Sequence, residues 1–363
     1  MIKAGVYVHL PFCLKKCTYC DFLSHPPKKG EIAAYLDALE IEIERFKVEG
    51  LTLFIGGGTP SVVPPALLVE LIHKLQQTYG PFLEASIEIN PATVDRDYLQ
   101  ALLFSGINRL SIGVQSFDDS TLQLMGRLHN SREAKEVIYL AREVGFKNIN
   151  IDLIYGYPGT DIISIEKTLK TAVALPVDHI SYYGLQLEPG SELFRKNLLQ
   201  IADEEFVEMY YLGLEILEAN GFFQYEVSNF AKENKECNHN LIYWHNKEYL
   251  GLGAGAVSRL GRRRFKNISS TDLYITNLKN NSRIIADSEK LTADLLLKEN
   301  IMLGLRLKKG LNPKQLGDRS LEELYPTETA FLLKEGLLEK VGPNIRLTKK
   351  ALPIMNTVIS RFF

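Results

Sequence analysis

The sequence predicts an α/β protein: a partial (β/α)6 barrel with a smaller C-terminal helical, winged-helix-like domain. Over the first 200 residues, short apolar runs rich in β-branched residues alternate with helical patterns, and polar residues recur where nearly every run ends. Strands that alternate with helices form parallel sheets. In a barrel the active site lies at the carboxyl ends of all strands, whereas a doubly wound sheet would concentrate polar residues at one switch point. The spread of polar residues therefore favours a barrel, complete or partial.

Each element follows from local patterns. From Ile32 to Phe46, apolar residues repeat at the spacing of one helix face, which predicts an amphipathic helix after the first strand. Gly56-Gly57-Gly58, Asn90-Pro91 and Pro158-Gly159 mark the joints between elements. The six strands are expected at residues 5–10, 51–55, 85–89, 109–114, 149–155 and 179–186.

After residue 200 the pattern changes to helices, a loop and a hairpin. Strand-like runs flank Gly342-Pro343-Asn344, which is typical of a hairpin, and helices followed by such a hairpin resemble a winged helix. We expect two domains, a core over residues 1–235 and a C-terminal unit over residues 236–363. Helices are expected at 203–218, 291–307 and 331–335, and a loop rich in Asn, Lys and His at 228–246.

Composition excludes several classes of protein. Apolar residues make up 45% and charged residues 24%, as in ordinary globular proteins. The net charge of -2 gives no basic surplus, so we expect no nucleic-acid partner, even for the winged-helix-like unit. The sequence contains neither a signal-peptide pattern nor an apolar run long enough for a membrane span. A cytoplasmic location is the expectation.

Three of the four cysteines fall within eight positions, with the spacing C-x3-C-x2-C at Cys13, Cys17 and Cys20. Thiolates are the normal ligands of iron–sulfur clusters. Three thiolates on a short loop bind three irons of a cubane and leave the fourth iron open for chemistry. Lys15 and Lys16 lie within the loop and favour the thiolate form.

A structural zinc site is the main alternative for these cysteines. Zinc takes four closed ligands, typically as two close pairs, so His9 or His25 would have to complete the set. Unligated cysteines are a further alternative. A disulfide framework does not fit, because Cys237 lies far from the other three and such frameworks need more pairs.

The string Tyr-Val-His-Leu-Pro-Phe-Cys over residues 7–13, with Tyr19 just before the last cysteine, resembles the HemN/HemW group of the radical SAM superfamily. The resemblance covers nearly the whole chain. It implies a [4Fe-4S] cluster on the three cysteines, whose open iron is chelated by the amino and carboxylate groups of S-adenosylmethionine (SAM). It also implies a one-electron reductant, because one electron from the reduced cluster breaks the carbon–sulfur bond of SAM.

The same resemblance implies a SAM pocket built from loops after successive strands. Glycines at residues 56–58 let the backbone approach a ligand, although a tight turn is the plainer interpretation. Arg127 suits the SAM carboxylate as a charged donor, and Gln115 and Asp152 suit the ribose hydroxyls. Taken singly, Arg127 also fits an ion pair and Asp152 a carboxylate at the barrel mouth. The full set that the resemblance assigns to SAM is Tyr7, Tyr19, Gly57, Gly58, Thr59, Glu88, Gln115, Arg127 and Asp152.

The HemN/HemW group contains both oxygen-independent coproporphyrinogen III dehydrogenases and heme chaperones. The dehydrogenases carry a fourth cysteine two places after the third, where this chain has Phe22, and a longer N-terminal extension than the six residues before the Tyr-Val-His string. The motif His-Asn-x-x-Tyr-Trp at residues 239–244 is similar to one associated with heme binding in the chaperones. Imidazole is a common axial ligand of heme iron, and aromatic rings pack on a porphyrin face. The heme-binding residues that this resemblance implies are His239, Tyr243 and Trp244.

We therefore expect a heme chaperone that binds a [4Fe-4S] cluster, SAM and heme, and passes heme to apo-hemoproteins such as respiratory enzymes. Peripheral membrane association through such recipients, and a homodimer, are compatible with this expectation. The alternative is a coproporphyrinogen III dehydrogenase, and no catalytic residue is assigned for it. For the motif at 239–244 the alternative is a loop that packs over the barrel, with His239 bonded to backbone groups.

Overall fold

The computed structural model describes residues 1–196 and 201–363. Within these residues, twelve strands form one sheet in the order β12-β11-β10-β9-β1-β2-β3-β4-β5-β6-β8-β7. Strands β1 to β6 pair with one another in parallel, which confirms the predicted α/β core with its parallel sheet. The six strands are β1 (Ile2–Leu10), β2 (Val48–Gly57), β3 (Glu84–Ile89), β4 (Arg109–Gln115), β5 (Ile149–Tyr155) and β6 (His179–Gly184).

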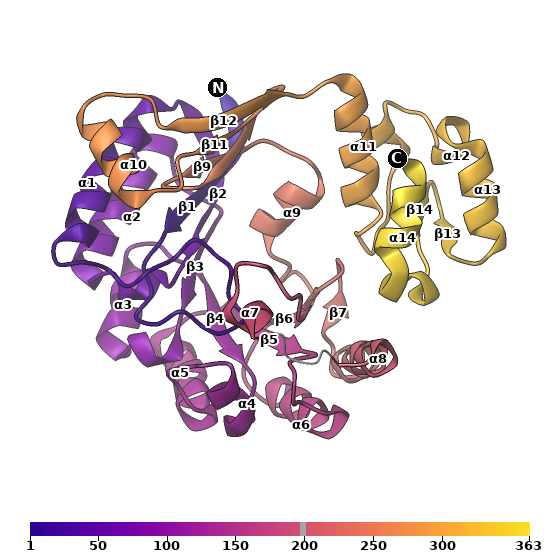
Figure 1. The fold of residues 1–363 in the computed structure, drawn as a ribbon, viewed down its shortest axis with the longest axis horizontal. Helices are drawn as coiled ribbons and strands as arrows, with labels where there is room; N and C mark the ends of the chain where they lie inside the picture. Colours follow the sequence, from indigo (N-terminus) through magenta and orange to yellow (C-terminus); the bar gives the residue numbers. More distant parts are fainter. Residues whose placement is uncertain (197–200) are drawn as a thin grey trace.

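Helices cover the outer face of this curved sheet (Figure 1). The outward side chains of the strands, such as Val6, Leu53 and Ile112, are fully buried and belong to one large apolar cluster beneath these helices. This burial is the main stabilising term of the core. The covering helices are α1 (Glu31–Arg45), α2 (Pro65–Tyr79), α3 (Arg96–Phe104), α4 (Asp119–Leu124), α5 (Ser131–Val144) and α6 (Ile162–Val173), with short 3-10 turns η1 (Pro60–Val62) and η2 (Pro91–Thr93).

The segment after β6 closes one side of the sheet. The prediction of a loop at residues 228–246 is wrong in part, because this segment contains a short strand, β8, and a helix, α9. The first backbone N–H groups of α9 donate to Glu84. The helix therefore forms through a tertiary contact with β3. The elements of this segment are α7 (Glu192–Arg195), α8 (Asp203–Ala219), β7 (Phe223–Gln224), β8 (Asn229–Ala231) and α9 (Asn238–Trp244).

Residues 249–290 extend the sheet at its other edge. Strand β9 pairs in parallel with β1, and β10 to β12 extend the sheet further as antiparallel strands. Glu42 of α1 ties this extension down, since its buried carboxyl accepts hydrogen bonds from Gly253 N at 2.7 Å and Asn267 Nδ2 at 2.6 Å. The elements are β9 (Tyr249–Leu252), β10 (Val257–Leu260), β11 (Arg263–Asn267), α10 (Thr271–Lys279) and β12 (Ile285–Lys290).

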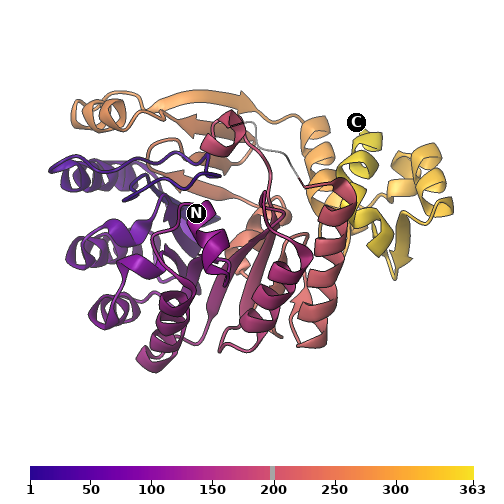
Figure 2. The ribbon, with the colours of Figure 1, turned by 60° about the horizontal axis from the view of Figure 1, so that its bottom comes forward.

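A smaller C-terminal unit follows, with its own apolar cluster (Figures 1 and 2). The hairpin predicted around Gly342 is present as β13 and β14. The expected division between residues 235 and 236 cuts the large sheet, so we propose that the C-terminal unit begins near residue 291. Its elements are α11 (Ala293–Gly304), η3 (Pro313–Leu316), α12 (Leu321–Leu324), α13 (Pro326–Lys334), β13 (Leu338–Val341), β14 (Asn344–Leu347), η4 (Lys349–Ile354), α14 (Met355–Ile359) and η5 (Ser360–Phe362). No helix in the described ranges has both the length and the apolar character needed to cross a membrane.

Candidate functional site

A cavity of about 890 Å³ occupies the concave side of the sheet. This volume lies toward the upper end of the usual range for ligand pockets. Its walls come from the inner faces of the strands, the cysteine loop and α9, and from Leu352, Pro353, Met355 and Asn356 of the C-terminal unit. The C-terminal unit therefore contributes a wall of the cavity at the side where the barrel is incomplete.

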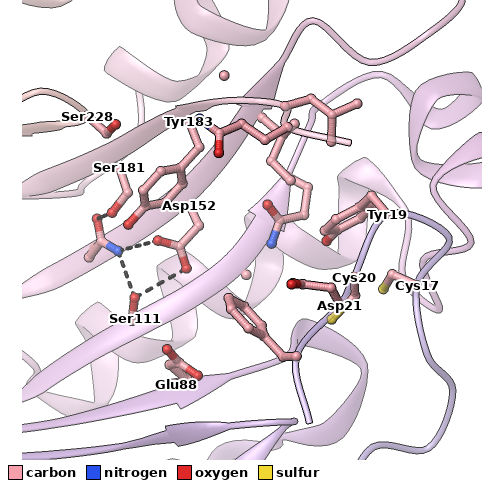
Figure 3. Close-up of a pocket in the computed structure, with 18 of the residues that line it drawn as sticks. Cys17, Tyr19, Cys20, Asp21, Glu88, Ser111, Asp152, Ser181, Tyr183 and Ser228 are labelled. Atoms are coloured by element: carbon pink, nitrogen blue, oxygen red, sulfur yellow. Dashed lines mark hydrogen bonds between the residues drawn. The ribbon is translucent and has the colours of Figure 1, made fainter. Parts of the chain in front are cut away.

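The inner face of the sheet is polar. Along each strand, buried apolar residues face the helices, and the residues between them line the cavity. In β5, for example, Asn150 and Asp152 line the cavity, whereas Ile151 and Leu153 belong to the apolar cluster. Figure 3 shows Ser111, Asp152 and Ser181 of the inner face on the opposite side of the cavity from Cys17 and Cys20.

The three clustered cysteines all line this cavity. Cys13 is buried, and its Sγ lies 3.3 Å from Thr59 Oγ1. Cys17 Sγ accepts a hydrogen bond from Arg127 Nη1 at 3.3 Å. Cys20 donates its backbone N–H to Cys17 O at 3.2 Å. The loop thus presents three sulfur atoms to one space, with a guanidinium beside one of them.

Without a metal, the surroundings of the cysteine loop favour the protonated form of Cys20. Burial raises the pKa of Cys20 to about 11, and the neighbouring Cys17 adds to this, whereas Lys16 acts to lower it. A proton on Cys20 would leave when a metal centre binds, because metals bind the thiolate. Lys16 Nζ also donates to Phe22 O at 2.9 Å and so fixes the shape of the loop.

The residues present fit a cubane better than a zinc ion. In the described ranges, no three Cys, His, Asp or Glu side chains converge as ligands of a single metal ion. His9 Nε2 is bonded to Leu23 O at 2.9 Å and His25 Nε2 to Glu31 at 2.9 Å, so both expected fourth ligands are already engaged. A cubane spreads its thiolates over separate irons and does not need them to converge.

The glycines after β2 are required by the cysteine loop itself. A Cβ on Gly58 would lie 2.6 Å from Phe12 O, and a Cβ on Gly57 would lie 2.8 Å from the His9 ring. Gly58 N donates to Leu10 O at 2.8 Å. The segment that carries the cysteines therefore requires glycine at both positions, and their contact with SAM stays a prediction.

Two carboxyl groups face the cavity beyond the glycines. Glu88 Oε2 accepts from Gly57 N at 3.1 Å, and burial, reinforced by the charge of Asp152, raises the pKa of Glu88 to about 8. Asp152 accepts from Asn150 Nδ2 at 2.8 Å and from Ser111 Oγ at 3.3 Å. Burial raises the pKa of Asp152, although these hydrogen bonds oppose the shift. Figure 3 shows the network around Asp152.

Gln115 and Arg127 shape the end of β4. Gln115 is buried with a φ of 70°, at a break in the register with β5. Such a conformation in a residue other than glycine stores strain and concentrates at functional sites. Arg127 donates to Gly113 O as well as to Cys17, and its Nε has no partner in the described chain.

Tyr7 of β1 and Tyr19 of the cysteine loop both line the cavity. The Tyr7 hydroxyl lies 3.0 Å from His9 Nδ1, while the opposite nitrogen of His9 donates to Leu23 O. Burial raises the pKa of both tyrosines. The structure therefore places all nine residues of the predicted SAM set around one cavity.

The motif at residues 239–244 forms α9 and closes the end of the cavity away from the cysteines. His239 is 1% exposed, with Nδ1 2.8 Å from Thr52 Oγ1 and Nε2 2.9 Å from the Tyr243 hydroxyl. Burial lowers the pKa of His239 to about 3, so its ring is neutral. His239, Asn240 and Tyr243 line the cavity, whereas Trp244 is half-buried and is not among the lining residues. We call this end, formed by His239, Asn240 and Tyr243, the cavity floor.

Sequence reasoning missed the polar residues deep in the strands. They precede the strand ends, where polar residues were sought, but their alternation with apolar residues is visible in the sequence. A strand with one polar face inside a protein signals an inner cavity. The missed lining residues include Arg109, Ser111, Asn150, Ser181 and Tyr183.

Comparison with known proteins identifies the family. The Radical SAM superfamily model matches residues 7–172, and the HemN C-terminal domain model matches residues 291–354. The chain is 34% identical to the heme chaperone HemW of Bacillus subtilis, over 99% of this chain and 98% of that protein. It is 33% identical to the heme chaperone HemW of Lactococcus lactis, over 99% of this chain and 97% of that protein.

A solved structure has the same fold. Coproporphyrinogen III oxidase (HemN) from Escherichia coli, described as a radical SAM enzyme, matches with a TM-score of 0.87 at 24% identity, over 99% of this chain and 90% of that chain. At this identity the likeness establishes the fold alone. With the matches above, it follows that the chain belongs to the radical SAM superfamily, as a HemW-like member with a HemN C-terminal domain.

Proposed function

We propose that this protein is a heme chaperone: it binds a [4Fe-4S] cluster, SAM and heme, and delivers heme to apo-hemoproteins. The observation that carries the proposal is the joint lining of one cavity by the cysteines, the SAM set and the heme-motif residues His239 and Tyr243. The full-length relatives named heme chaperone HemW support it.

Cys13, Cys17 and Cys20 would hold the cluster. When bound, the cluster supplies the electron that cleaves SAM, which a one-electron reductant must first provide. Arg127 stabilises a negative charge on Cys17, because its Nη1 already donates to that sulfur. The same guanidinium is expected to reach the SAM carboxylate, since its Nε has no partner in the described residues.

We predict that SAM affinity depends on pH through Glu88. The free protein holds Glu88 mostly protonated at neutral pH, since its pKa is raised to about 8. SAM is a sulfonium cation and favours the ionised carboxylate, so binding releases a proton. Affinity should therefore rise between about pH 6.5 and 8, at a slope of up to about tenfold per pH unit, and level off above pH 8. Equilibrium dialysis of SAM under anaerobic conditions measures this.

The matched variant is Glu88→Gln, which keeps the shape and cannot ionise. Its affinity profile should lose the part of the slope that belongs to Glu88, and any remaining slope belongs to other titrating groups, such as Asp152 and the amino group of SAM. Identical profiles in the two proteins would rule out Glu88 as the titrating group.

Heme is proposed to bind above the cavity floor. We assign the ring proton of His239 to Nδ1, where it is donated to Thr52 Oγ1, so that Nε2 accepts from Tyr243. Histidines that ligate metals are oriented in this way by a partner on the other ring nitrogen. The neutral ring needs to lose no proton before binding iron. Heme binding would therefore exchange the hydrogen bond of Tyr243 for iron at Nε2.

The second candidate function is coproporphyrinogen III oxidation, the activity in the name of the Escherichia coli protein that has the same fold. The test uses anaerobically reconstituted protein in two assays, heme titration and turnover of coproporphyrinogen III with SAM and a reductant. The chaperone proposal expects near-unit heme stoichiometry, transfer of heme to an apo-hemoprotein and no protoporphyrinogen IX. Catalytic formation of protoporphyrinogen IX would establish the dehydrogenase instead.

A further inference from the structure

Arg109, at the start of β4, is a buried cation without a direct partner. Its side chain is 1% exposed and lines the cavity. Its Nε has no hydrogen-bond partner, and Arg109 forms no ion pair within the described ranges. A buried charge is costly unless it is paired and hydrogen-bonded. Arg109 is therefore a group for which a bound anion would supply the missing contacts.

The nearby carboxylates are committed to other groups. Glu84 accepts from Asn238 N at 2.9 Å and from His239 N at 2.9 Å, and so holds the start of α9. Asp152 accepts from Asn150 and Ser111. Both acids act electrostatically to raise the pKa of Arg109, against burial, so the guanidinium stays charged. They compensate its charge at a distance and leave its Nε without a hydrogen-bond partner.

Arg109 lies beside the cavity floor. Arg109 pairs with Ser86 of β3, two residues after Glu84, which holds the start of α9 and so of the floor. It is six residues before Gln115, about 20 Å along an extended strand, so it lies far from the cysteine end of the cavity. SAM chelates the cluster through its carboxylate, and that group therefore belongs near Cys17 and Arg127. The anion at Arg109 must come from a different ligand.

We propose that Arg109 binds a carboxylate of the tetrapyrrole cargo, namely a propionate, at the cavity floor. This inference rests on the proposed heme function and adds to it the polar anchor of the ligand. A guanidinium fork matches a carboxylate with two parallel hydrogen bonds. A propionate at Arg109 orients the macrocycle next to His239, whereas an unanchored apolar disc could rotate in the cavity.

The test compares heme with its dimethyl ester, in which both propionates are blocked. Both are titrated into the reconstituted wild-type protein, Arg109→Gln, Arg109→Lys and the exposed control Arg132→Gln. Wild type and the control should bind heme about 10- to 100-fold more tightly than the ester. Arg109→Gln should bind heme only as tightly as the ester, with ester and SAM affinities unchanged. Arg109→Lys keeps the positive charge but lacks the two parallel donors of the guanidinium, so its preference for heme over the ester should be intermediate.

Each other result has a defined meaning. Equal preference for heme over the ester in wild type and Arg109→Gln would overturn the inference and leave the heme function standing. Weaker SAM binding in Arg109→Gln, with unchanged heme affinity, would mean that Arg109 binds the carboxylate of SAM. That result would also overturn the inference. Wild type without heme binding would overturn the proposed function itself. If Arg109→Gln does not fold, Arg109→Lys is compared with wild type instead. A preference for heme over the ester that falls to half or less in Arg109→Lys supports the inference, and an unchanged preference overturns it.

Discussion

Replacing Cys13, Cys17 or Cys20 with Ala is expected to remove nearly all iron from the anaerobically reconstituted protein. Each thiolate would hold a separate iron, and within the described residues no other Cys, His, Asp or Glu group converges at the loop to replace it. The losses should be similar at the three positions, because all three line the same cavity. Iron and acid-labile sulfide per protein, together with the visible absorption band, measure the effect.

Cys237→Ala is the matched control for these variants. Cys237 is also a free and buried thiol, but it lies next to Glu84 near the cavity floor, 3.5 Å from the carboxylate. Its removal should leave iron content unchanged. Stoichiometric zinc in wild type, or an iron loss in Cys237→Ala equal to that of the other three, would contradict the cluster assignment.

His239→Ala is expected to abolish the Soret shift that heme shows on binding and to weaken heme by at least about 100-fold, since an axial ligand is lost. Thr52→Val removes the partner that orients Nδ1, and should weaken heme by about tenfold without moving the band. Tyr243→Phe frees Nε2 and should bind heme at least as tightly as wild type. Hemin titration followed by absorption and resonance Raman spectroscopy separates these effects.

A buried histidine can be structural, so His239→Ala needs a control for folding. Free imidazole, added to the cavity left by the ring, should restore the band if the ring only ligates iron. Retained cluster content in the same sample shows that the barrel is intact. A band unchanged from wild type in His239→Ala would remove this residue as the ligand, and His239 would then be a support for α9 through Thr52 and Tyr243.

The sequence-based predictions were strongest where a pattern is local. The alternation in β5 and the helix face from Ile32 onward need no tertiary information, and their elements are confirmed within two residues at each end. The short helix α9 was missed, because its polar motif carries no amphipathic period and its N–H groups are satisfied by Glu84, far away in the sequence. The pairing of β9 with β1 joins residues more than 200 positions apart, which no local pattern reports.

The same limit applies to the site. The cysteine spacing and the strand-end motifs can be recognised in the sequence, and the structure brings those residues together around one cavity. The left-handed conformation of Gln115 and the missing partner of Arg109 are properties of packing, so they emerge only from coordinates. The sequence also could not show that Gly58 is needed against Phe12 O.

The cavity is continuous from the cysteines to the floor, and this has a consequence for regulation. Two ligands that occupy neighbouring parts of one space alter each other's affinity, and the coupling is reciprocal by thermodynamic necessity. If bound SAM changes the affinity for heme by some factor, bound heme must change the affinity for SAM by the same factor. A cell's supply of SAM would then set how tightly the carrier holds its cargo, even in a cycle where SAM is never cleaved.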